Sequence, residues 1–61
     1  MTSTIDKIEP QIDGRSYVTE RHVLDDGSEQ FVTYLAEADA DIYVILAMHA
    51  QSFIAVAGDG E

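Results

Sequence analysis

The sequence contains no cysteine and no tryptophan, a single proline and only three basic residues among its 61. Without cysteine no disulfide can brace the chain, and zinc sites built on thiolates are excluded. A domain of this size rarely gains more than roughly 3–5 kcal/mol from its own core unless a disulfide, a metal or an oligomeric neighbour supports it. Assembly with other chains is therefore the expected source of further stability.

Basic residues are scarce, and twelve acidic residues give a formal net charge of −9 at pH 7. Binding to nucleic acid is not expected, because neutralising phosphates takes clustered Lys and Arg. The acidity could keep an apolar small protein soluble, meet a basic partner surface, or imitate nucleic acid in front of a protein that binds it. The side chains of Asp25, Asp26 and Glu29 are the candidates for contact with a basic surface.

The distribution of apolar residues predicts neither a targeting signal nor a membrane-spanning segment. The first residues, MTSTIDKIEP, lack the apolar central region of a signal peptide. The longest apolar segment, residues 42–57, is shorter than the ~20 residues that a helix needs to cross the hydrocarbon, and its flanks are acidic. We expect a soluble, intracellular protein with no membrane contact.

No motif for catalysis, cofactors or metals is present. The serines lack the context of a nucleophile elbow, no glycine-rich phosphate loop occurs, and DDGSEQ lacks the alternating oxygen ligands of a calcium loop. His22 belongs to the expected central strand and His49 to the expected helix, so they would converge only if the helix packed on that face of the sheet. Solvated or core-lining histidines explain both better, and we predict neither an enzyme nor a bound cofactor or metal.

Two Asp-Gly pairs divide the first 36 residues into segments of β composition. Residues 1–12 are expected to form an N-terminal arm or edge strand, because Pro10 cannot donate a ladder hydrogen bond. The pair Asp13-Gly14 predicts a tight hairpin turn with positive φ at both turn residues. Residues 15–36, rich in Tyr, Val and Thr, are expected to form a β-hairpin around a second turn.

The register of this hairpin depends on where its turn lies. A turn centred on Asp26-Gly27 places His22 opposite Phe31 and Thr19 opposite Tyr34. Neither face of the central strand is uniformly apolar, which fits a helix on one side and either a neighbouring subunit or solvent on the other.

Residues 39–57 are expected to form an α-helix, with Asp39 as its N-cap and Gly58 at its end. The polar side, where His49 lies, also carries large apolar side chains, so the helix is apolar nearly all the way round. Such a helix needs burial on more than one side, and a chain of this length can cover about one. The expected apolar face comprises Ile42, Tyr43, Leu46, Ala47, Ala50, Phe53, Ile54 and Ala57.

The sequence thus predicts a single α+β domain over residues 1–61, a three-stranded antiparallel β-meander followed by one α-helix. The chain is expected to act through protein-protein contacts, as an oligomer or against other proteins. Aromatic and long apolar side chains serve best as interface anchors. The predicted anchors are Tyr43, Leu46, Met48, Phe53 and Ile54 on the helix and Tyr17 and Tyr34 on the sheet.

A resemblance agrees with this reading. The run DGRSYVTERH at residues 13–22, the Gly27 turn, the YLA sequence ending at Ala36 and ADAD at residues 38–41 resemble a group of small proteins encoded by tailed bacteriophages. That group shares a DGRxYVxExH-type strand, a second turn and an alanine-rich helix, and the resemblance covers about residues 13–50. It implies a non-enzymatic, virion-associated structural or assembly protein of the head, neck, tail or baseplate. Such a protein is made in the host cytoplasm and contacts other virion proteins or copies of itself.

Two alternatives belong to other functional classes. A small acidic inhibitor that occupies a host protein's nucleic-acid channel would gather its carboxylates on one face. A homodimeric regulator would need one isologous helix interface. A structural component would instead carry scattered charge.

Overall fold

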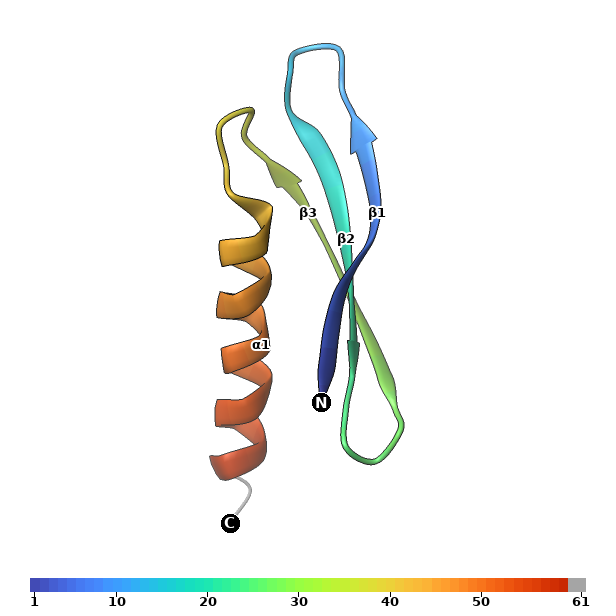
Figure 1. Ribbon diagram of the computed structural model, residues 1–61, viewed down its shortest axis with the longest axis vertical. Coiled ribbons are helices and arrows are strands. Elements are labelled where there is room, and N and C mark those ends of the chain that lie inside the picture. The colour runs from blue at the N-terminus through green and yellow to red at the C-terminus, as the bar shows by residue number, and fades with distance from the viewer. Residues whose placement is uncertain (60–61) are drawn as a thin grey trace.

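The computed structural model describes the backbone of residues 1–59 and the side chains of residues 1–53. The elements, in chain order, are strands β1 (Thr2–Pro10), β2 (Ser16–Val23) and β3 (Glu29–Ala36) and helix α1 (Ile42–Asp59). The strands form one antiparallel sheet in the order β1-β2-β3, and α1 runs alongside it (Figure 1). The predicted α+β fold, a β-meander followed by one helix, is confirmed.

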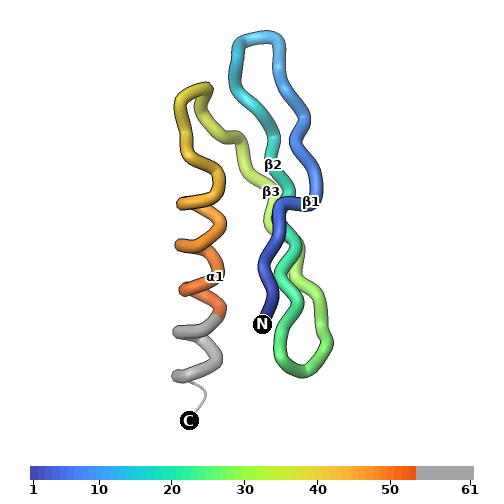
Figure 2. The backbone as a smooth tube through the Cα atoms, in the orientation of Figure 1, coloured from blue at the N-terminus to red at the C-terminus, as the bar shows by residue number. Residues whose placement is uncertain are grey.

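The molecule is long and thin. Its principal extents are 44, 18 and 13 Å, and the two hairpin turns lie at opposite ends of the sheet (Figure 2). A single helix on a three-stranded sheet leaves little interior. Among the described residues the buried apolar side chains are those of Val18 and Ala36, while Glu20 and His22 are buried as well. The centre of this fold is therefore largely polar.

Both hairpins turn through three-residue loops rather than two-residue ones. In the second loop, Leu24 N donates to Ser28 O over 2.8 Å and Gly27 N donates to Leu24 O over 2.9 Å. Gly27 has φ of +86°, whereas no described residue other than glycine has positive φ. The first loop is closed in the same way, and its Gly14 has φ of +91°. The prediction of positive φ at both turn residues was wrong, because each aspartate keeps ordinary backbone angles and only the glycine is left-handed.

The longer loop shifts the hairpin register by one residue from the predicted one. Thr19 lies opposite Thr33, and His22 lies opposite Gln30 instead of Phe31. A one-residue shift exchanges the partners across the whole ladder. In the observed register Phe31 faces Arg21 on the side of the sheet away from the helix.

The helix begins later than expected, at Ile42 rather than residue 39. Asp41 caps it, because its Oδ1 accepts the backbone N–H of Tyr43 at 3.1 Å and that of Val44 at 3.3 Å. Asp39 lies in the preceding turn and is not the cap. The helix runs to Asp59, beyond the expected stop at Gly58.

The face of α1 that meets the sheet also differs from the expected one. Tyr43 and Ala47 were expected on the buried face but are exposed, whereas His49 is turned toward the sheet. The helix packs against β1 and β2. The side chains along this stripe are half-buried and comprise Ile42, Ile45, Leu46, His49, Ala50 and Phe53.

Within the described residues, no helix is long and apolar enough to cross a membrane.

Candidate functional site

A buried polar cluster joins the helix to the sheet. Side chains alternate along a strand, so Val18, Glu20 and His22 of β2 all point toward α1. Glu20 Oε1 lies 2.8 Å from His22 Nε2 and 2.7 Å from His49 Nδ1. The side chains of Glu20 and His22 have no solvent exposure. A carboxylate offers only acceptors, so each imidazole donates its N–H to the same oxygen.

Ser3 of β1 extends this cluster. Its Oγ lies 2.7 Å from His22 Nδ1, because Ser3 pairs with His22 across the β1-β2 ladder. Serine, imidazole and carboxylate are thus linked in the order of a catalytic relay. His22 is fully enclosed, however, and both of its nitrogens are occupied by Ser3 and Glu20. The arrangement fixes the position of His22 and leaves it no free nitrogen for a substrate.

Two aromatic rings enclose the cluster. The ring of Phe53 lies 4.7 Å from that of His22, measured between centroids. The Tyr34 ring meets that of His49 edge to face at 5.5 Å. Together with the contact between Ser3 and His22, these ring contacts join β1, β2, β3 and α1. The cluster therefore fixes the seat of the helix on the sheet.

Two polar atoms of the cluster are buried without a hydrogen-bond partner among the described residues, namely Glu20 Oε2 and the Tyr34 hydroxyl. Burial raises the pKa of Tyr34 above its ordinary value, and the negative charge of Glu20 raises it further. Within the part of the chain that the structure describes, no group of three or more His, Cys, Asp or Glu side chains is arranged so that it could hold a metal ion.

The side of α1 away from the sheet is an exposed apolar surface. Tyr43 is 68% exposed, Val44 54% and Met48 63%. Ala47 lies between them and is also exposed. The spacing of three and four residues places these four side chains side by side. We call Tyr43, Val44, Ala47 and Met48 the outer helix face.

A second exposed surface lies on the opposite side of the sheet. Tyr17 of β2 pairs with Leu35 of β3, and Phe31 lies two pairs further along the same face. All three are exposed. Between them the hydroxyls of Thr19 and Thr33 lie 3.2 Å apart. We call Tyr17, Phe31 and Leu35 the outer sheet face.

The structure separates the predicted anchors into two groups. Tyr17, Tyr43 and Met48 are exposed, while Tyr34, Leu46 and Phe53 are half-buried on the side where sheet and helix meet. The side chain of Ile54 lies outside the described residues. The sequence did not identify Val44 and Phe31 as exposed anchors, because only the observed helix rotation and strand register show them.

The acidic turn predicted for a basic partner is engaged within the chain. Asp25 Oδ1 accepts a hydrogen bond from the amino group of Met1 over 2.7 Å. Asp26 Oδ1 accepts Ser28 N at 2.9 Å, and Glu29 pairs with Arg21. The Ser28 hydrogen bonds lower the pKa of the Asp26 carboxyl.

No protein-family model, curated protein or solved structure matches the chain. The function is therefore inferred from the two exposed apolar surfaces and the buried cluster between them.

Proposed function

We propose that this protein is a non-enzymatic assembly component that binds another protein through the outer helix face. The resemblance over residues 13–50 suggests a tailed-bacteriophage virion as the assembly. One observation carries the proposal. The described part of the chain encloses only two apolar side chains, Val18 and Ala36, while three large ones stand more than half exposed on one side of a single helix. An apolar surface of this kind is typical of a protein interaction site.

The charge of the chain favours a different protein, rather than a second copy, on this face. The exposed carboxylates of Asp39 and Asp41 lie next to the N-terminal end of the helix. With a net charge of −9 on each chain, two copies packed by this face would repel each other, whereas a groove rimmed by Lys and Arg would attract these carboxylates. The proposed partner therefore has an apolar groove with a basic rim.

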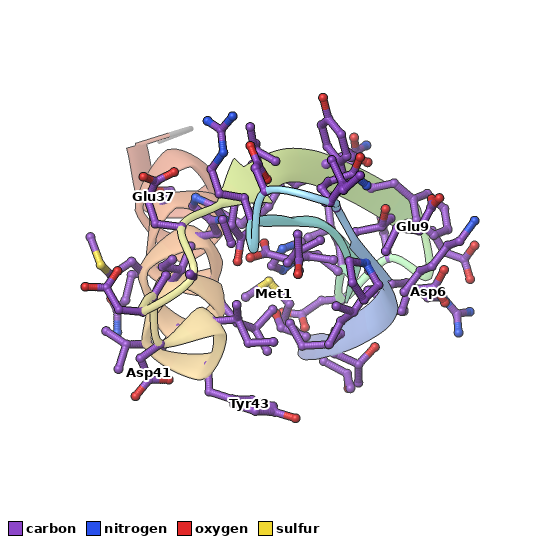
Figure 3. All side chains as sticks on the ribbon, turned by 90° about the horizontal axis from the view of Figure 1, so that it is seen from above. Met1, Asp6, Glu9, Glu37, Asp41 and Tyr43 are labelled. Carbon is purple, nitrogen blue, oxygen red and sulfur yellow. The ribbon has the colours of Figure 1, made fainter. Side chains whose placement is uncertain are left out.

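The distribution of carboxylates supports a structural role over nucleic-acid mimicry. Asp6 and Glu9 point away on the β1 side of the molecule, while Glu37 and Asp41 lie on the opposite side near the helix (Figure 3). A nucleic-acid mimic needs its charges in rows on one surface, and these are divided between two.

The test is recovery of the chain in assembled particles. Virions are collected from a host that expresses this gene, purified on a density gradient and washed in salt. They should retain the wild-type chain. Met48→Glu should lose most of it, because a charge enters the centre of the outer helix face. Thr4→Glu adds the same charge at an exposed position on β1 and should be retained like wild type. A chain that is absent from the particles, or a Met48→Glu variant retained like the control, would contradict the proposal.

A further inference from the structure

The sheet has two open edges, and they differ in character. The β1 edge is irregular, since the ladder shifts register between Ile5 and Lys7 and the strand ends at Pro10. A bulge, an edge lysine and a proline are devices that prevent a further strand from pairing. The β3 edge has none of these. Residues 30–36, QFVTYLA, contain no charge, proline or glycine.

The backbone of β3 has donors and acceptors free along this edge. In an antiparallel pair, hydrogen-bonded and non-hydrogen-bonded residue pairs alternate. The bond from Leu24 N to Ser28 O begins this alternation at the turn. Even-numbered residues of β3 therefore bond to β2, and the N–H and C=O groups of Phe31, Thr33 and Leu35 point to the open edge.

Each carboxylate next to β3 has an arginine near it, although Arg15 pairs more closely with Asp13, at 2.5 Å. Glu29 at its start pairs with Arg21, and Glu37 just beyond its end lies 3.9 Å from Arg15. Two of the three basic residues of the chain thus flank this one strand. In a protein with a net charge of −9, the β3 edge is a stretch that a second copy can approach without strong repulsion.

We propose that two copies pair through β3, antiparallel and centred on Thr33, to form a continuous six-stranded sheet. This register places Phe31 opposite Leu35 of the second copy on the outer sheet face. It also places Val32 opposite Tyr34 of the second copy on the helix side. Apolar side chains then meet apolar ones at each of these positions, and cross-strand pairs of this kind stabilise sheets.

The register centred on Thr33 also places Glu29 opposite Glu37 of the second copy at each end of the paired strands, beyond the apolar pairs and close to Arg21 and Arg15. The neighbouring registers bring a carboxylate among the apolar side chains instead. Centring on Val32 puts Glu29 opposite Leu35, and centring on Tyr34 puts Phe31 opposite Glu37. Each places a carboxylate against an apolar side chain. The two-fold pairing uses the same surface on both copies, so it closes at a dimer.

This inference extends the proposed assembly function by naming the chain itself as one of its partners, on a surface separate from the outer helix face. Contact through the β3 edge and contact through the outer helix face can each be disproved without the other.

The absence of cysteine provides a direct test. Residues in a hydrogen-bonded antiparallel pair have Cα atoms about 5.5 Å apart, within the range that a disulfide spans. Purified Thr33→Cys should form a disulfide-linked dimer under mild oxidation, at a rate at least tenfold above that of Thr19→Cys. The Thr19→Cys variant is a matched control, because it loses the same hydroxyl contact but lies on the central strand.

Thr33→Lys alone should be monomeric by light scattering, and mixing it with Thr33→Glu should restore dimers. In the wild-type chain, raising the protein concentration should slow amide exchange at Phe31, Thr33 and Leu35 by a larger factor than at Val32 and Tyr34, whose N–H groups already bond to β2. Equal cross-linking of the two cysteine variants, or exchange independent of concentration at all five amides, would overturn the dimer. The double variant Met48→Glu/Thr33→Cys should form the disulfide-linked dimer at the same rate as Thr33→Cys alone. This result separates the β3 dimer from the particle test, in which Met48→Glu is expected to fail.

Discussion

His49 Nδ1 lies 2.7 Å from Glu20 Oε1, so the middle of the helix is joined to the middle of the sheet through a polar contact. Glu20 is completely enclosed, and its Oε1 also accepts from His22. Most small folds place a large apolar side chain at such a point. Here the helix is positioned by a carboxylate, and its position depends on the groups that surround that carboxylate.

Replacing the carboxylate should therefore destabilise the fold. Glu20→Leu leaves His22 Nε2 buried without a partner, and we expect a loss of about 1–3 kcal/mol in the free energy of unfolding, measured by urea denaturation. Gln51→Ala, at an exposed helix position, should change stability by less than about 0.5 kcal/mol.

A second substitution tests whether loss of the contact between Glu20 and His49 contributes to this destabilisation. In the Glu20→Leu background, His49→Leu should cost less than it does in the wild type, since its polar partner has already gone. The double-mutant cycle should give a coupling energy of about 0.5–3 kcal/mol between the two positions. Simple additivity would mean that His49 and Glu20 do not interact in solution.

The Tyr34 hydroxyl is buried beside the same carboxylate and has no hydrogen-bond partner among the described residues. Tyr34→Phe removes an unpaired polar atom and should leave stability at pH 7 unchanged or raise it by up to about 1 kcal/mol. Tyr43→Phe, at an exposed position, is the control. A large loss for Tyr34→Phe would indicate that the hydroxyl is hydrogen-bonded in solution.

Tyr34 also predicts a dependence of stability on alkaline pH. Its pKa in the folded chain is raised, first by burial and then by the charge of Glu20. The unfolded chain releases this proton at about pH 10, so the contribution of Tyr34 to stability is complete below that pH. It is lost as the pH rises from there through the raised folded pKa. The urea midpoint should fall over this interval, and less steeply in Tyr34→Phe than in Tyr43→Phe.

Gly27 should be sensitive to substitution because of its backbone alone. Its φ is +86°, and a Cβ added there meets nothing within 4 Å. Gly27→Ala should therefore cost about 1–2 kcal/mol through the left-handed conformation, and Gly27→Asn should cost less because asparagine tolerates that region better. Equal urea midpoints for the Ala variant and wild type would show that the turn adopts another conformation.

Local patterns in the sequence were sufficient to predict the order of the elements. The Asp-Gly pairs located both turns, and Pro10 marked β1 as an edge strand. The register was missed by one residue because a two-residue and a three-residue loop share the same Asp-Gly signal, and only the φ of the aspartate separates them. A composition-based reading cannot supply that angle.

The buried cluster was harder to predict for a different reason. His49 interrupts an apolar helix, and placing it on the solvent side is the expected choice for a polar residue. That choice reverses only when a carboxylate on another element is available, and Glu20 lies 29 positions away in the sequence. The alternation of Val18, Glu20 and His22 on one face of β2 gave the only local sign that this face is polar.

The N-cap of the helix is a place where sequence and structure differ, because Asp39 was the predicted cap and Asp41 is the observed one. Asp41 accepts the backbone N–H groups of Tyr43 and Val44, whereas Asp39 lies in the turn before the helix. Asp41→Ala should therefore lower the free energy of unfolding by about 1 kcal/mol. Asp39→Ala removes the same charge and should have an effect of less than half that size. Urea denaturation of the two variants side by side measures the difference, and the reverse order of effects would place the helix start two residues earlier. Because Tyr43 and Val44 belong to the outer helix face, fraying of this turn should also weaken retention of Asp41→Ala in purified particles.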